Sequence, residues 1–226
     1  MPPSKPPPDQ LLVRRERLAV CETLETVGPD VPTLCGDWDA RQLAAHLVLR
    51  EGHPAAVGVG IGPLHGWTEH TQNNLARSPF SQLVRRLRSG PPWWSPLGWS
   101  TLDAAFNTFE YFVHHEDVRR AATRWSPRPL SQADQAELWR LLAGRAKIFV
   151  RRSPVTVHLV PTGLPAAVQR ERLTLQPGRL ANGQVTLTGT PGELGLYLHG
   201  RRAHAVVEVT GTDSAVSKFE SIDLSV

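Results

Sequence analysis

Apolar residues recur at helical spacing through the first two thirds of the chain. Such a three-to-four-residue period is typical of helices that bury one face. Helices are predicted over segments 9–27, 40–52, 64–76, 79–88, 102–121 and 131–151. The fifth segment is apolar almost all round in its first half, which indicates a helix buried between neighbours.

Local signals support these boundaries. Gly28 with Pro29 ends the first helix, and Asp39 with Gln42 three residues later forms a predicted capping box for the second. Ser78, followed by a proline, is the predicted cap of the helix after it, and Ser131 caps the last one. The first part of the chain is therefore predicted to be all helical.

The pattern changes at Ser153, where alternating residues replace helical spacing. Alternation predicts strands, and an Asn-Gly pair between two of them predicts a hairpin. Strands are expected at 155–160, 172–175, 184–188 and 203–209, and helices at 190–200 and 214–222. The resulting fold class is a helical bundle at 10–152 followed by a small α+β domain at 153–226.

The first nine residues are rich in proline and lack the apolar core of a signal peptide. They are predicted to form a disordered tail, and the protein is expected in the cytoplasm. No apolar run approaches the roughly 18 to 20 residues of a membrane span. No membrane association is therefore expected.

The chain of 226 residues carries a net charge of +4 and a pI near 9.6. Its arginines are scattered as pairs and form no recognition motif, so nucleic-acid binding is not expected. The two cysteines, Cys21 and Cys35, form no CxxC pair. Cys21 lies on a predicted helix face and is interpreted as a small core residue.

The buried segment 102–121 contains Glu110 and His114, which are one helical turn apart on the same face. His46 lies among small and aliphatic residues of the second predicted helix. Buried ionisable groups need partners, so Glu110 and His114 either bond to each other or to a nearby arginine, or they share a metal ion, with His46 as a third ligand. Two imidazoles and one carboxylate suit a catalytic zinc or non-haem iron site.

Other residues are assigned supporting roles. His115 points about 100° away from His114 and is a poorer ligand, whereas Asp117 is placed to orient an imidazole from outside the ligand set. Trp94 belongs to a loop rich in Pro, Gly and Trp that either covers the end of the bundle or forms a wall of a substrate pocket. Arg50 is a candidate anion-binding residue, or a partner of a nearby carboxylate.

The runs GDWDARQLAAHL, at 36–47, and FEYFVHHEDVRR, at 109–120, resemble the DinB-like metal-binding bundles. More closely, the chain resembles the mycothiol-dependent maleylpyruvate isomerase family and its metal-binding subgroup. That branch joins a four-helix bundle to an α+β domain with a P-x-E-L…L-x-G-R element, which is similar to residues 191–201 here. The resemblance implies that His46, Glu110 and His114 bind a divalent metal, usually Zn2+.

The resemblance also implies a function. A low-molecular-weight thiol such as mycothiol would bind the metal, lose its proton and attack an electrophilic acceptor, giving S-transfer or isomerisation. Two alternatives stay open on the sequence: a non-catalytic metal-binding or stress-response protein, and a hydrolase that uses metal-bound hydroxide. A structural metal site would need a fourth ligand, for which His53, His65, His70 and His115 are the candidates.

Overall fold

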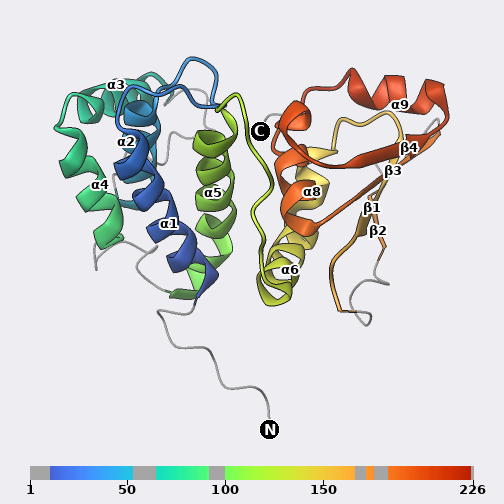
Figure 1. The fold of residues 1–226 in the computed structure, drawn as a ribbon. Coiled ribbons are helices and arrows are strands. Elements are labelled where there is room, and N and C mark those ends of the chain that lie inside the picture. Colours follow the sequence, from blue (N-terminus) through green and yellow to red (C-terminus); the bar gives the residue numbers. More distant parts are fainter. Residues whose placement is uncertain (1–10, 53–64, 92–99, 166–171, 176–182, 225–226) are drawn as a thin grey trace, which may run out of the picture. The chain divides into compact units, whose positions relative to one another are not determined.

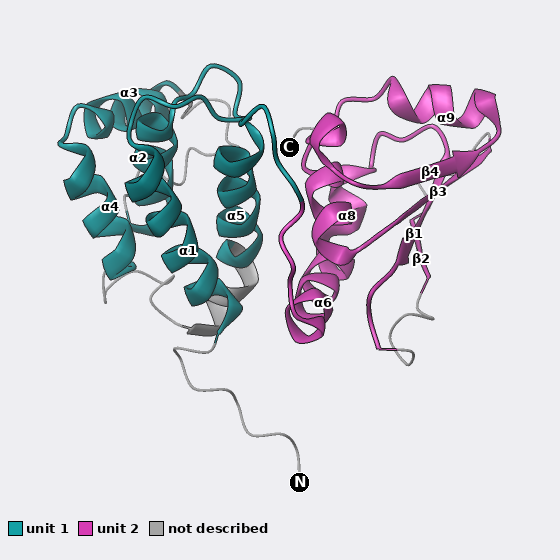
Figure 2. Cartoon of the chain, in the orientation of Figure 1, with its two compact units in different colours: residues 1–126 teal, residues 127–226 magenta. Residues whose placement is uncertain are grey.

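The computed structural model describes residues 11–52, 65–91, 100–165, 172–175 and 183–224 (Figure 1). The chain is mainly helical, with one small four-stranded sheet near its C-terminal end. It forms two compact units, Met1–Ser126 and Pro127–Val226 (Figure 2). The predicted tail at 1–9 and the Trp94 loop lie outside the described residues.

The first unit contains five helices among its described residues. They are α1 (Leu12–Val27), α2 (Ala40–Gly52), α3 (His65–Ala76), α4 (Phe80–Ser89) and α5 (Ser100–Arg120). α1 packs on α4 and α5, and α2 packs on α3, α4 and α5. Because α2 and α5 are neighbours, polar side chains on their facing sides come close together.

The core of this unit is built from aliphatic side chains of α1, α2 and α4, with Tyr111 and Val118 from α5. A buried polar network crosses it: Arg17 Nε donates to Glu51 Oε1 at 2.7 Å and to the Tyr111 hydroxyl at 3.3 Å. Each charged group there has a partner, as burial requires. The network joins α1, α2 and α5.

Two of the predicted caps are present as expected and one is not. Asp39 Oδ1 accepts from Gln42 N at 2.8 Å and Gln42 Oε1 accepts from Asp39 N at 3.0 Å, which confirms the capping box. Ser131 Oγ accepts from Asp134 N at 3.1 Å. The prediction for Ser78 was wrong, because Pro79 is the N-cap residue of α4 and no side-chain hydrogen bond closes that end.

The second unit begins with α6 (Gln132–Phe149), a helix that the sequence assigns to the bundle. α6 packs on α8 (Pro191–Leu198), and Gln135 Oε1 accepts from Gly192 N at 3.0 Å. The division between the units therefore lies at residue 126 rather than at the predicted residue 152. Helical periodicity indicates that a face is buried, but it does not tell which partner buries it.

The sheet has the order β2-β1-β3-β4, from Leu173–Leu175, Thr156–Pro161, Gln184–Gly189 and Glu208–Gly211. β1 pairs parallel to β3 and antiparallel to β2. The predicted hairpin between β2 and β3 is therefore wrong, since β1 lies between them. Gly183 has φ of 108° and a Cβ there would lie 3.0 Å from Ala215 Cβ, so its glycine serves this close approach.

The end of the chain also differs from expectation. The strand predicted at 203–209 is shorter, because Arg202–His204 is a 3-10 helix (η5) and β4 begins at Glu208. The last helix, α9 (Asp213–Glu220), is capped by Thr212, whose Oγ1 accepts from Ala215 N at 3.3 Å. In the described part of the chain, no helix combines the length and apolarity needed to cross a membrane.

Candidate metal centre

The three predicted ligands converge within the first unit. His46 comes from α2, and Glu110 and His114 come from successive turns of α5. One ligand atom from each of the three lies within 4.8 Å of the others. His114 Nε2 is 3.6 Å from Glu110 Oε2, and the two imidazole rings meet edge to face with centroids 5.3 Å apart. These distances are compatible with a shared divalent ion.

His46 is oriented by a residue of α3. Its Nδ1 lies 3.2 Å from Gln72 Oε1, so a proton on Nδ1 is donated to that amide oxygen. The Trp38 ring lies against the imidazole with centroids 5.0 Å apart. The lone pair is then on Nε2, the nitrogen available to an ion.

His114 is oriented in the same way by Asp117, three residues further along α5. His114 Nδ1 is 2.9 Å from Asp117 Oδ2, and the carboxylate is fully buried. A carboxylate on one imidazole nitrogen raises the basicity of the other and fixes the ring. Asp117 thus contacts His114 on the ring nitrogen that does not face Glu110.

Glu110 has a second neighbour in Arg50 of α2. Arg50 Nη2 is 3.2 Å from Glu110 Oε1, the carboxylate oxygen that does not face His114. Both side chains keep some exposure, at 22% for Arg50 and 24% for Glu110. Arg50 therefore lies at the rim of the cluster, in contact with one of its carboxylate oxygens.

The cluster is electrostatically polarised. Burial opposes a charged His114, but hydrogen bonds with Asp117, Cys35 and Glu110 outweigh it and raise its pKa well above the usual value. Burial likewise opposes charge on Glu110, yet His114 and Arg50 hold its pKa below its usual range. Burial, with the nearby His114 and Arg50 cations, lowers the pKa of His46 to about 3. These shifts favour a positive charge on His114 and a neutral His46.

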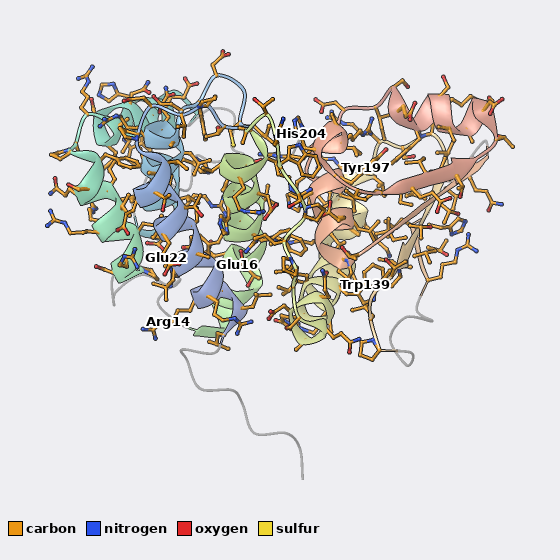
Figure 3. All side chains as sticks on the ribbon, in the orientation of Figure 1. Arg14, Glu16, Glu22, Trp139, Tyr197 and His204 are labelled. Carbon is orange, nitrogen blue, oxygen red and sulfur yellow. The ribbon has the colours of Figure 1, made fainter. Side chains whose placement is uncertain are left out.

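His115 lies on a different side of α5 and does not belong to the group of His46, Glu110 and His114. Its Nε2 is 2.8 Å from Thr23 Oγ1, and its Nδ1 is 3.6 Å from Glu16 Oε2, both on α1 (Glu16 is labelled in Figure 3). Its side chain is buried. These contacts are those of a residue that joins α1 to α5.

Cys35 is a member of the cluster that the sequence reasoning missed. Its Sγ donates to Asp117 Oδ2 at 2.9 Å and lies 3.4 Å from His114 Nδ1. Cys35, His114 and Asp117 form a second group whose ligand atoms lie within 4.8 Å of one another. The loop that carries Cys35 has no periodicity, so only its position shortly before Trp38 and the capped α2 hinted at this site.

The basic pair after the ligands takes part in local ion pairs. Arg119 Nη1 lies 2.9 Å from Glu116 Oε1, and Arg120 Nε lies 2.5 Å from Glu116 Oε2. Arg120 is buried, and its guanidinium stacks on the Trp125 ring at 4.6 Å. These arginines stabilise the end of α5.

The element at 191–201 lies in the second unit. Pro191 is the first residue of α8, and Glu193 Oε2 accepts from Val206 N at 2.7 Å. Arg201 donates to the His199 carbonyl at 2.5 Å. The element therefore holds α8 and the segment that follows it in place.

Comparison of the chain with models of protein families, with curated proteins and with solved structures finds no match.

Proposed function

We propose that the first unit binds one divalent cation, Zn2+ in the cell, through His46, Glu110 and His114. The observation that carries this proposal is the matched anchoring of the two imidazoles. Each has its Nδ1 on an oxygen acceptor, Gln72 or Asp117, which leaves its Nε2 for an ion. Such outer partners are typical of histidines that bind metals.

The donor set fits a divalent ion of the zinc type. Two imidazole nitrogens and one carboxylate are common zinc ligands, and three protein ligands leave a position for water or substrate. Within the described residues, no fourth His, Cys, Asp or Glu joins this group. His115 bonds to α1, and His70 bonds to Asn74 on its own helix at 2.9 Å. This arrangement favours an open site over a closed structural one.

We propose membership of the DinB-like bundles, in the metal-binding subgroup of the mycothiol-dependent maleylpyruvate isomerase family. The proposal is supported by the motifs at 36–47 and 109–120, which contain all three ligands. A divalent ion held there would favour the thiolate form of a bound low-molecular-weight thiol, such as mycothiol. The reaction class is transfer of that sulfur to an electrophilic carbon, or isomerisation by addition and elimination.

The residues around the ligands have separate tasks in this proposal. Gln72 and Asp117 hold the imidazoles in one tautomer and orientation. Arg50 supplies positive charge at the rim, and its buried Nε makes no hydrogen bond within the described part of the chain. A partly exposed guanidinium at the rim suits an anionic group on the thiol or on its acceptor.

The metal proposal is tested by elemental analysis of the purified protein. Wild type should contain close to one equivalent of divalent metal more than Glu110→Ala and His46→Ala, because each variant lacks one ligand of this set. His70→Ala is the matched control, because His70 is an exposed histidine of the same unit outside the group. Full metal content in both ligand variants would contradict the assignment.

The thiol proposal is tested by calorimetry and melting of the zinc-loaded protein with a panel of thiols that includes mycothiol. A thiol at 100 times its dissociation constant should stabilise the fold by about 2.7 kcal/mol. The same thiols should have no effect on Glu110→Ala. If zinc binds but no thiol prefers the zinc form, a non-catalytic or hydrolytic metal protein replaces the thiol proposal.

A further inference from the structure

We propose a second cation position, for a thiophilic divalent ion, on the opposite side of the His114 imidazole. Its donors are Cys35 Sγ, Asp117 Oδ2 and His114 Nδ1. The first ligand set uses the other ring nitrogen, Nε2, which faces Glu110. One imidazole thus presents its two nitrogens to two different sets of donors.

The three donor atoms form a tight triangle. Cys35 Sγ is 2.9 Å from Asp117 Oδ2 and 3.4 Å from His114 Nδ1, and the last two atoms are 2.9 Å apart. In a tetrahedral zinc site with bonds of about 2.0 to 2.3 Å, neighbouring donors lie about 3.3 to 3.6 Å apart. The triangle would therefore open by roughly half an ångström on binding such an ion.

Two hydrogens converge on one oxygen in this triangle. The Cys35 thiol and the His114 Nδ1–H both point to Asp117 Oδ2. An ion bound there would take the place of these hydrogens and be held by sulfur, nitrogen and carboxylate oxygen together. Cys, His and Asp are all established zinc ligands, and a thiolate selects for softer ions.

The backbone holds Cys35 in this position by contacts outside the triangle. Leu34 N donates to the Asp117 carbonyl at 3.1 Å, which ties the loop to α5. Thr33 Oγ1 accepts from Cys35 N at 3.2 Å and donates to the Trp38 carbonyl at 2.8 Å. The sulfur is therefore placed on the α5 carboxylate by a pinned loop.

The three donor residues differ in how far they are exposed to solvent. Asp117 is fully buried and His114 is 8% exposed, whereas Cys35 is half-buried. The sulfur is thus the member of the triangle that an ion arriving from solvent meets first. The first ligand set contains no sulfur, so the two positions differ in the metals that they prefer.

The test uses Cd2+ alone, added to the metal-free full-length protein, with the ultraviolet charge-transfer band of a cadmium–thiolate bond as the readout. The chain has only two cysteines, so the sulfur is identified by comparing Cys35→Ser with Cys21→Ala. His46→Ala dismantles the first ligand set and leaves the triangle intact. Wild type, Cys21→Ala and His46→Ala should all show the band.

Cys35→Ser should lose the band and bind Cd2+ at least tenfold more weakly than Cys21→Ala in the His46→Ala background. Two results would overturn the proposal: absence of the band in wild type, or its loss in His46→Ala, which would place the sulfur on an ion of the first set. Protection of Cys35 from a maleimide by Cd2+, located by mass spectrometry in wild type, tests the same contact without a variant. Unchanged labelling there also counts against the site.

Discussion

His114 and His115 are adjacent on α5 and both are buried, yet they belong to different regions of the molecule. His114 faces α2 and has a carboxylate on each side, Glu110 and Asp117. His115 faces α1, where the Thr23 hydroxyl and the Glu16 carboxylate contact it. Burial of a histidine therefore does not identify a ligand. The direction of the oxygen acceptors around each ring nitrogen is what separates these two residues.

The largest expected contrast between these two regions is in metal content. His114→Ala removes the ring that both ligand groups share, so bound metal should fall to near zero. His115→Ala should keep the wild-type equivalent, because its contacts are with α1. Elemental analysis of both variants measures this directly. Equal loss in the two would show that the fold, and not the ligand set, had failed.

A smaller effect on metal binding is expected from Asp117, whose carboxylate contacts His114 Nδ1. Asp117→Asn keeps the size of the side chain but weakens the hold on His114 Nδ1, and should lower zinc affinity by about 10- to 100-fold. Glu16→Gln makes the same chemical change beside His115 and should leave zinc affinity unchanged. Competition with a fluorescent chelator gives both affinities. An unaltered affinity in Asp117→Asn would remove that residue from the site.

Removing the His115 side chain, which contacts α1, should lower the stability of the fold rather than its metal content. His115→Ala leaves a cavity and deprives Glu16 and Thr23 of a buried neighbour, so the free energy of unfolding should fall by about 2 kcal/mol. Urea unfolding of the metal-free protein measures this loss. A change within a few tenths of a kcal/mol would mean that the contact with α1 is not structural.

The smallest effect concerns Cys21 of α1. Burial raises the pKa of its thiol from 9.0 to about 12. The folded state keeps the thiol proton at pH values where the unfolded state loses it, so stability falls as pH rises from about 9 to 12. The suppressed ionisation of Cys21 should make the free energy of unfolding about 1.4 kcal/mol lower at pH 10 than at pH 7. The free energy of unfolding is measured against pH in wild type and in Cys21→Val, and only wild type should show this decline. An equal decline in the two proteins would mean that a group other than Cys21 causes it.

The sequence was most informative where a residue pattern is local. The capping box of α2 and the one-turn spacing of Glu110 and His114 are visible in a few residues, and both are present in the structure. Asp117 was also accessible, because it lies on the same helix as the imidazole that it holds. Periodicity places such groups on one face before anything is known of their partners.

The failures concern contacts between distant segments. Cys35 is 79 residues from His114, and its loop has no periodic pattern that would direct it to α5. α6 reads as one more bundle helix, yet its buried face packs on α8, whose sequence lies beyond the predicted boundary. Alternation identifies β2 and β3 as strands but not their neighbours, and the hairpin predicted from the Asn-Gly pair is therefore wrong.

The strand order also has a consequence for the time course of folding. Even the pairing with the shortest separation along the chain, Leu159 with Leu173, closes a loop, and β1 meets β3 only through the whole segment between them. Loop closure must precede every one of these described pairings, and non-local contacts slow folding. The hydrogen bonds within a helix, by contrast, join residues only four apart. The C-terminal sheet should therefore acquire protection from hydrogen exchange only after these loops have closed during refolding.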